Sequence, residues 1–134
     1  TLPFMGTIPG GLKPDMAVLF QGAVPLNAKR FEINFHTGQS YDDGIAFHFN
    51  PCITAKYVCM NNLRNGKWEN DECVYDKPFP KGTSFCLLIV IKSEGYEVHV
   101  NGLRFYFFKH RQSLEQVTTL GIRGDVFISV CGFI

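Results

Sequence analysis

The segment Ile45–Cys52, Ile-Ala-Phe-His-Phe-Asn-Pro-Cys, places an imidazole and a carboxamide two residues apart. If this segment is a strand, alternate side chains point to opposite faces. The apolar set, expected to face a core, is Ile45, Phe47 and Phe49. The set expected to face outward is Ala46, His48, Asn50 and Cys52. His48 and Asn50 would then lie roughly 7 Å apart, about the spacing of hydroxyl groups on one face of a sugar ring.

A second segment carries the only tryptophan of the chain, Trp68. Asn65-Gly66 predicts a tight hairpin turn, so residues 56–61 should pair with residues 68–74 as antiparallel strands. This pairing brings Asn61 and Trp68 onto one surface. An indole face suits the apolar side of a pyranose, and fixed polar side chains can bond its hydroxyl groups. A tryptophan packed over a sheet edge is the alternative interpretation.

These residues, in this order, resemble the signature of the galectins. The galectin pattern is His-x-Asn-Pro-Arg on one strand, Asn on the next, and Trp-Gly-x-Glu-x-Arg on the third. The matching residues here are His48-Phe49-Asn50-Pro51-Cys52, then Asn61, then Trp68-Glu69-Asn70-Asp71-Glu72-Cys73. The similarity covers essentially the whole chain and is greatest to a single carbohydrate-recognition domain of the tandem-repeat type.

The resemblance implies a role for each matching residue. His48 and Asn50 would bond the axial 4-hydroxyl of galactose, and Asn61 would bond the 6-hydroxyl. Trp68 would stack under the ring, while Asp71 would reach the 6-hydroxyl and the neighbouring sugar. The residues expected to line an extended groove for further sugars are Arg30, Glu32 and Asn34.

The chain departs from the galectin pattern at both signature arginines, which are Cys52 and Cys73 here. A thiol is a weak donor and does not replace the planar guanidinium fork. Each lost charge-assisted bond is expected to cost about 1.5–3 kcal/mol of binding free energy. The signature glutamate is a shorter Asp71. Plain alternation from Trp68 would place Glu72 on the indole face instead, so Asp71 and Glu72 are both candidates for the sugar-facing acid.

The number of cysteines is odd and no pair has Cys-x-x-Cys spacing, so the sequence predicts neither a disulfide framework nor a zinc knuckle. The five are Cys52, Cys59, Cys73, Cys86 and Cys131. With a strand between them, Cys52 and Cys73 would be roughly 9.6 Å apart, too far for a disulfide. A soft-metal site of these two thiols and His48 lacks the usual ligand spacing. A Cys–His nucleophile would lack an oxyanion hole and an orienting third residue. We therefore expect no metal, no cofactor and no enzymatic activity.

The elements that must position these residues are strands almost throughout. The 134 residues and 46% hydrophobic content predict one globular domain over residues 1–134. The expected strands are residues 17–24, 30–36, 45–52, 56–61, 68–74, 85–91, 96–100, 103–108 and two between 120 and 134. Residues 85–91 form a nearly continuous apolar run, expected to be buried on both sides. Residues 112–118 hint at one helical turn. Many short strands with frequent turns predict an all-β, two-sheet antiparallel sandwich, which the resemblance specifies as a galectin-type, concanavalin-like jelly roll.

The predicted function is a carbohydrate-binding lectin of galectin type, which binds β-galactosides such as lactose weakly or with altered glycan specificity. The alternative is a galectin-fold protein that has lost sugar binding and acts through protein–protein contacts. The net charge of +1 and the lack of a long apolar run favour neither nucleic acid nor membrane insertion. Galactose-containing glycans or glycoproteins are the expected partners, with a homodimer or a tandem-repeat chain left open. Without a signal peptide or glycosylation acceptor, and with free thiols, we expect a cytoplasmic or nuclear location. The resemblance adds secretion without a signal peptide.

Overall fold

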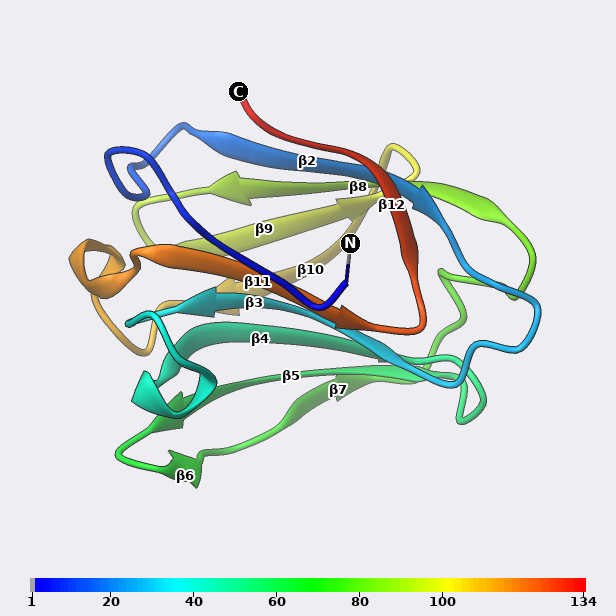
Figure 1. Cartoon of the computed structure of the whole chain (residues 1–134), viewed down its shortest axis with the longest axis horizontal. Coiled ribbons are helices and arrows are strands. Elements are labelled where there is room, and N and C mark those ends of the chain that lie inside the picture. The colour runs from blue at the N-terminus through cyan, green and yellow to red at the C-terminus, as the bar shows by residue number, and fades with distance from the viewer. Residues whose placement is uncertain (1) are drawn as a thin grey trace.

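Two antiparallel sheets pack face to face in the computed structural model, which describes residues 2–134 (Figure 1). The seven-stranded first sheet contains, in spatial order, β1 (Phe4–Thr7), β11 (Thr119–Gly124), β3 (Phe31–His36), β4 (Ile45–Cys52), β5 (Tyr57–Arg64) and β6 (Lys67–Trp68), with β7 (Glu72–Val74) also paired to β5. The five-stranded second sheet is ordered β10 (Leu103–Lys109), β9 (Gly95–Val100), β8 (Ser84–Ile91), β2 (Ala17–Ala23) and β12 (Phe127–Phe133). The predicted all-β sandwich is confirmed. Thr1, which the predicted domain includes, lies outside the described residues.

Two short 3-10 turns, Tyr41–Asp43 and Leu114–Gln116, complete the architecture. The second confirms the helical turn expected within residues 112–118. The first, and strand β1, were not predicted. Over residues 2–134, no helix is long and apolar enough to cross a membrane.

Aromatic rings fill the space between the sheets and form a rigid floor beneath the first sheet. The Phe47 ring stacks on Tyr96 at 4.5 Å between centroids and lies 4.8 Å from the Phe108 ring. Phe35 stacks on the same tyrosine at 5.5 Å. All four side chains are fully buried, and burial of each contributes about 1.5–3 kcal/mol. Alternation along β3, and along β4 from Phe47 onward, thus directs the odd-numbered residues inward and the even-numbered residues outward.

Strand β8 is half-buried, so the expectation that both of its sides are covered is wrong. Its buried residues are Phe85, Leu87, Ile89 and Ile91. Its partly exposed residues are Cys86, Leu88 and Val90. The second sheet covers the core with one face only, and in the described part of the chain no further layer packs on its other face. An apolar run in sequence therefore does not distinguish a central strand from a half-buried one.

A β-bulge at Ala46 changes the predicted alternation at the start of β4. Ile45 pairs with His36, whereas Phe47 pairs with the preceding residue, Phe35, so β4 carries one extra residue. Ala46 consequently joins the core cluster next to Phe47, and Ile45 is buried outside that cluster. The prediction that Ala46 faces outward is wrong for this reason, whereas Ile45 is buried as predicted. From Phe47 onward the predicted alternation holds.

Candidate functional site

A groove of about 510 Å³ lies on the outer face of the first sheet. It is lined by Arg30, Glu32, Tyr41, His48, Asn50, Cys52, Tyr57, Cys59, Asn61, Trp68, Glu69, Asp71 and Arg123. Three residues that the sequence placed at this site do not line the groove, namely Asn34, Glu72 and Cys73. Five residues line it without having been predicted as site residues, namely Tyr41, Tyr57, Cys59, Glu69 and Arg123.

Strand register explains how residues distant in sequence meet here, because cross-strand pairs share a face. One row of paired residues is Asn34, His48 and Asn61. The next row is Asn50, Cys59 and Cys73. The third row is Arg30, Cys52 and Tyr57. The groove therefore runs across strands β3, β4 and β5.

A hydrogen-bond chain fixes the protonation of His48. The Asn34 amide Nδ2 donates to Glu32 Oε1 at 3.1 Å, so Asn34 Oδ1 must accept from His48 Nδ1–H at 2.6 Å. Burial lowers the pKa of His48 to about 4, with Arg30 and Arg123 adding to the decrease and Glu32 opposing it. The ring is neutral at pH 7, and its Nε2 atom is a hydrogen-bond acceptor on the edge away from Asn34.

Glu32 is a buried carboxylate, 2% exposed, at the centre of a polar network. Its oxygens contact Arg30 NH2 at 3.0 Å and Arg123 Nε at 3.2 Å, and they accept from the Tyr41 hydroxyl at 3.1 Å. Burial raises the pKa of Glu32, but the Asn34 hydrogen bond and the charges of His48 and the two arginines outweigh it and lower the pKa overall. Glu32 therefore holds the groove wall and keeps both guanidinium groups in place.

Tyr41 extends this wall from the 3-10 turn. Arg123 lies over the Tyr41 ring at 3.8 Å from its centroid, and the ring edge faces Trp68 at 6.5 Å between centroids. Burial and the charge of Glu32 raise the pKa of Tyr41 to about 12. The sequence could have predicted that Arg123 faces outward, because it follows the inward-facing Ile122 on a strand. Tyr41 lies in a loop, where the sequence carries no periodic signal.

Trp68 lies at the rim of the groove with 45% of its surface exposed. Its ring centroid is 4.6 Å from that of His48. The indole thus contacts the imidazole on one side and leaves apolar surface beside the His48 acceptor. Trp68 thus lies on the edge strand of the first sheet, as the alternative expected, with nearly half of its surface still exposed.

A bulge after Trp68 decides which acid faces the groove. Leu63 pairs with Trp68 and Cys59 pairs with Cys73, so five steps along one strand oppose four along the other. The predicted single strand over residues 68–74 is therefore broken into β6 and β7. Asp71 lines the groove, whereas Glu72 bonds Arg111 at 2.7 Å and the Tyr106 hydroxyl away from it.

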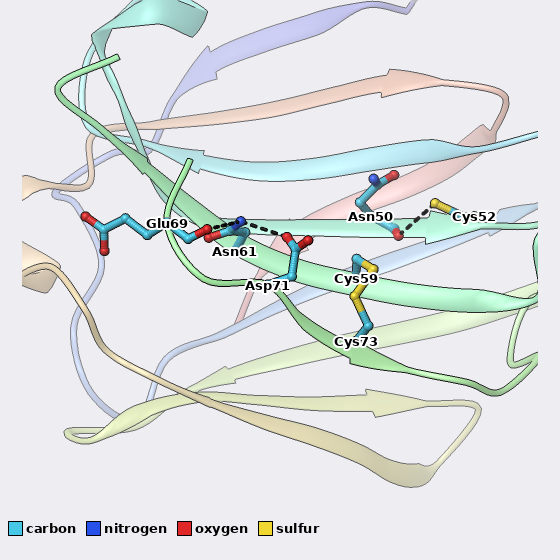
Figure 2. The surroundings of a disulfide bond; sticks show 7 residues. All are labelled: Asn50, Cys52, Cys59, Asn61, Glu69, Asp71 and Cys73. Atoms are coloured by element: carbon cyan, nitrogen blue, oxygen red, sulfur yellow. Dashed lines mark hydrogen bonds between the residues drawn. A yellow bond between two sulfur atoms is a disulfide. The ribbon is translucent and has the colours of Figure 1, made fainter. Parts of the chain in front are cut away.

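Asn61 holds Asp71 where the galectin pattern has arginines. Its Nδ2 donates to Asp71 Oδ1 at 2.8 Å and to the Glu69 carbonyl at 3.1 Å (Figure 2). Its Oδ1 accepts from Asn62 N–H at 2.8 Å and from Arg111 at 3.1 Å. The Asn61 amide is thus fully used within the protein, and Asp71 Oδ2 is left for a ligand.

A disulfide joins Cys59 to Cys73, which contradicts the expectation that all cysteines are free (Figure 2). The two residues are directly paired on β5 and β7, with Cα atoms 4.1 Å apart. The rejection of a Cys52–Cys73 bridge holds, because Cys59 lies on the strand between them. Cys52, Cys86 and Cys131 are free. With Cys73 oxidised, the two-thiol metal site is ruled out, and residues 2–134 hold no cluster of metal-ligating side chains.

Asn50 has an unused acceptor in the groove. Its Oδ1 atom is buried and has no hydrogen-bond partner within the described chain. A buried acceptor of this kind costs about 1–3 kcal/mol unless a ligand or water satisfies it. Next to it, the Cys52 thiol donates weakly to the Asn50 carbonyl at 3.7 Å (Figure 2).

Acceptor atoms and a half-exposed indole in one groove of a two-sheet sandwich are features typical of lectins. Residues 3–133 match the family model of the galactoside-binding lectins. Bovine galectin-4 is 41% identical over the whole chain, which covers 41% of that protein. Among solved structures, a variant of human galectin-16 aligns with a TM-score of 0.92 at 28% identity, covering 100% of this chain and 96% of that one. Sheep galectin-11 in complex with glycerol aligns at 0.90 and 25% identity, covering 98% and 97% of the two chains.

The chain belongs to the galectin family of galactoside-binding lectins. It spans about two fifths of the length of the galectin-4 relatives that it matches.

Proposed function

We propose that the groove binds β-galactosides such as lactose weakly or with altered glycan preference. The observation that carries this proposal is the unprotonated Nε2 of His48 beside the exposed face of Trp68. A pyranose stacked on the indole would present its hydroxyl hydrogens to this acceptor and to the partnerless Oδ1 of Asn50. An axial 4-hydroxyl, which has one hydrogen, would donate to one of these two acceptors, and an equatorial epimer would direct that hydrogen away from both.

The acid and the neighbouring amide have different parts in the proposed complex. Asp71 Oδ2 accepts from the 6-hydroxyl or the adjoining sugar. Asn61, which the resemblance assigned to the 6-hydroxyl, instead positions Asp71, because both of its amide hydrogens are already donated. Glu72 makes no contact with sugar, since it is paired with Arg111 outside the groove.

Low affinity is expected because no guanidinium is present at positions 52 and 73. Cys52 presents a thiol to the groove, and Cys73 is held in the disulfide with Cys59. Each missing charge-assisted bond costs about 1.5–3 kcal/mol, roughly one to two decades in affinity. The two arginines that do line the groove, Arg30 and Arg123, are engaged with Glu32.

The extended part of the groove differs from the sequence prediction in one residue. Arg30 and Glu32 line it, but Asn34 is only 1% exposed and acts through His48. Tyr41 and Arg123 supply the wall on this side. We propose that further sugars contact the exposed guanidinium groups of Arg30 and Arg123.

Retention on a lactosyl resin, followed by elution with free lactose, tests the proposal. We expect retarded elution of the parent protein and passage of the Trp68→Ala variant without delay. An exposed-site variant, Leu103→Ala, is the matched control, since this residue lies at the β9–β10 turn, outside the groove. Binding on a glycan array without retention on lactose would mean altered specificity. No signal in either measurement would overturn the proposal and favour a protein-contact role.

The location and the partners of the protein are predictions that rest on sequence. We propose a cytoplasmic or nuclear protein that can leave cells without a signal peptide, with galactose-bearing glycoproteins as partners. The free-thiol argument for this location now rests on Cys52, Cys86 and Cys131, because the other two cysteines are bridged. Fractionation of cells expressing the full natural chain is the measurement.

A further inference from the structure

A second hollow, of about 470 Å³, opens at the end of the sandwich next to the groove. It lies between the β4–β5 turn and the loop of residues 76–81. Cys52 and Tyr57 line both the groove and this pocket. No role for the pocket follows from the proposed lectin function.

The floor of the pocket is apolar and fixed in place by the core. Phe79 is 2% exposed, and its ring packs edge-on against Phe31 at 5.3 Å and Phe85 at 5.2 Å. Val58 is also buried, and Ile53 packs against the core from the turn. Because these side chains belong to the packed interior, the pocket does not collapse when it is empty.

The rim of the pocket is positively charged. Lys56, Lys77 and Lys81 line it and are exposed, and within residues 2–134 none of the three is in an ion pair. Asp76 is the one acid among the lining residues, and its carboxylate accepts from the backbone N–H of Lys77 at 2.8 Å. Three lysines and one aspartate give the rim a net charge of +2. An apolar floor beneath unpaired ammonium groups complements a ligand with an apolar body and an anionic group.

We propose that this lysine-rimmed pocket binds a small aromatic anion, with the ring on Ile53 above the buried Phe79 and a sulfonate, sulfate or carboxylate between Lys77 and Lys81. A neutral apolar ligand would fill the floor but leave the charged rim unused. A pocket of about 470 Å³ is within the range of small-molecule sites.

The probe for the test is 8-anilinonaphthalene-1-sulfonate, followed by its fluorescence on titration into the folded protein. We expect saturable one-to-one binding that weakens with added salt. The Lys77→Gln/Lys81→Gln double variant should bind about threefold to tenfold more weakly, because two exposed charges are removed. The matched control, Lys67→Gln/Lys109→Gln, removes two exposed lysines outside the pocket and should bind like the parent. N-phenyl-1-naphthylamine, which lacks the sulfonate, should bind the double variant and the parent equally.

A charge introduced at one position provides a second test. Thr54 is an exposed residue of the pocket wall. Thr54→Asp should weaken sulfonate binding, and Thr54→Asn, of the same size without the charge, should not. Amide chemical shifts on titration should change at Ile53, Thr54, Lys77 and Lys81. The proposal would be overturned if the pocket and control lysine variants were weakened equally or if no saturable binding occurred. It would also be overturned if the shifts were confined to the exposed residues of β12. Lactose leaves these readouts unchanged, so failure here is distinct from failure of sugar binding.

Discussion

His48 combines burial, a fixed tautomer and a position in the groove, so its titration reports on the folded state. Its pKa is lowered to about 4 from an ordinary value of 6.5. The unfolded chain therefore binds a proton at a pH where the folded protein does not, and stability is lost as pH falls from 6.5 toward 4. At 1.36 kcal/mol per pKa unit, the loss reaches about 3 kcal/mol.

Urea unfolding at a series of pH values between 4 and 7 measures this loss. We expect a shallower decline for His48→Gln than for the parent, since the variant lacks the titrating imidazole. The pKa of His36 is lowered by burial too, so part of the slope should persist in the variant. Identical slopes in the two proteins would contradict the assignment to His48.

Cys52 is the position where a single side chain should restore affinity. It lines the groove beside Asn50, and its thiol contributes one weak hydrogen bond. In Cys52→Arg, a guanidinium would contribute a charge-assisted bond to sugar or to Asp71, raising lactose affinity by about tenfold or more. Calorimetric titration is the measurement, and Cys52→Met, long but uncharged, is the control. Equal affinities of the Arg and Met variants would show that charge at this position is not what the groove lacks.

At the scale of elements, the disulfide ties the three-residue strand β7 to β5. A sequence separation of 14 closes a loop of about 15 residues, for which chain entropy predicts about 3 kcal/mol of stabilisation. The Cys59→Ala/Cys73→Ala variant should lose about that much free energy of unfolding. A reducing agent should destabilise the parent and leave the variant unchanged. If reductant affects both equally, the bridge is not the source of the effect.

Restoring the second signature arginine also has to take the bridge into account. Cys73→Arg alone would remove the disulfide and leave Cys59 as an unpaired thiol in the groove. The appropriate comparison is Cys59→Val/Cys73→Arg with Cys59→Val/Cys73→Ala, so that both proteins lack the bridge. The arginine variant should bind lactose more tightly by calorimetry, because only it can form a charge-assisted bond to Asp71. Equal affinity in the two would place Asp71 out of reach of this position.

The sequence predicted strands well and their irregularities poorly. Period-two patterns located β2, β3, β4, β9 and β10, because each has one face on the core, and a nearly continuous apolar run located β8. The bulges at Ala46 and after Trp68 break that period by one residue, and no residue type announces them. The Cys59–Cys73 pair and the turn of Glu72 away from the groove follow from the second bulge. The hairpin at Asn65-Gly66 was predicted, but plain counting from it pairs Cys59 with Glu72 instead of Cys73.

The groove itself was predicted in large part, since eight of its lining positions were named from spacing and resemblance. The hydrogen-bond network was not. Asn34 behind His48, and Tyr41 beneath Arg123, depend on loop and side-chain placement that a one-dimensional pattern does not contain.

At the scale of the whole molecule, the edge where the terminal strands lie carries exposed apolar side chains. Strands β1 and β12 are edge strands of the first and second sheet, and residues of both line one hollow. Phe4 and Phe127 line one hollow between them, and Phe127 is 63% exposed. Val130 and Phe133 add further exposed apolar surface on β12. Unpaired strand edges next to apolar side chains are typical sites of association.

We therefore predict that the chain self-associates through this edge. In light scattering over a concentration series, the parent should show a rising average mass, and Phe127→Asp should remain at the monomer mass, because association would bury the carboxylate. Leu103→Asp places the same charge at an equally exposed apolar residue of the β9–β10 turn, remote from the edge, and should associate like the parent. Lactose binding should be unchanged in both variants, since the groove lies on the outer face of the first sheet and contains neither residue. A parent that stays monomeric at all concentrations, or a Leu103→Asp variant that dissociates equally, would contradict association through the β1–β12 edge.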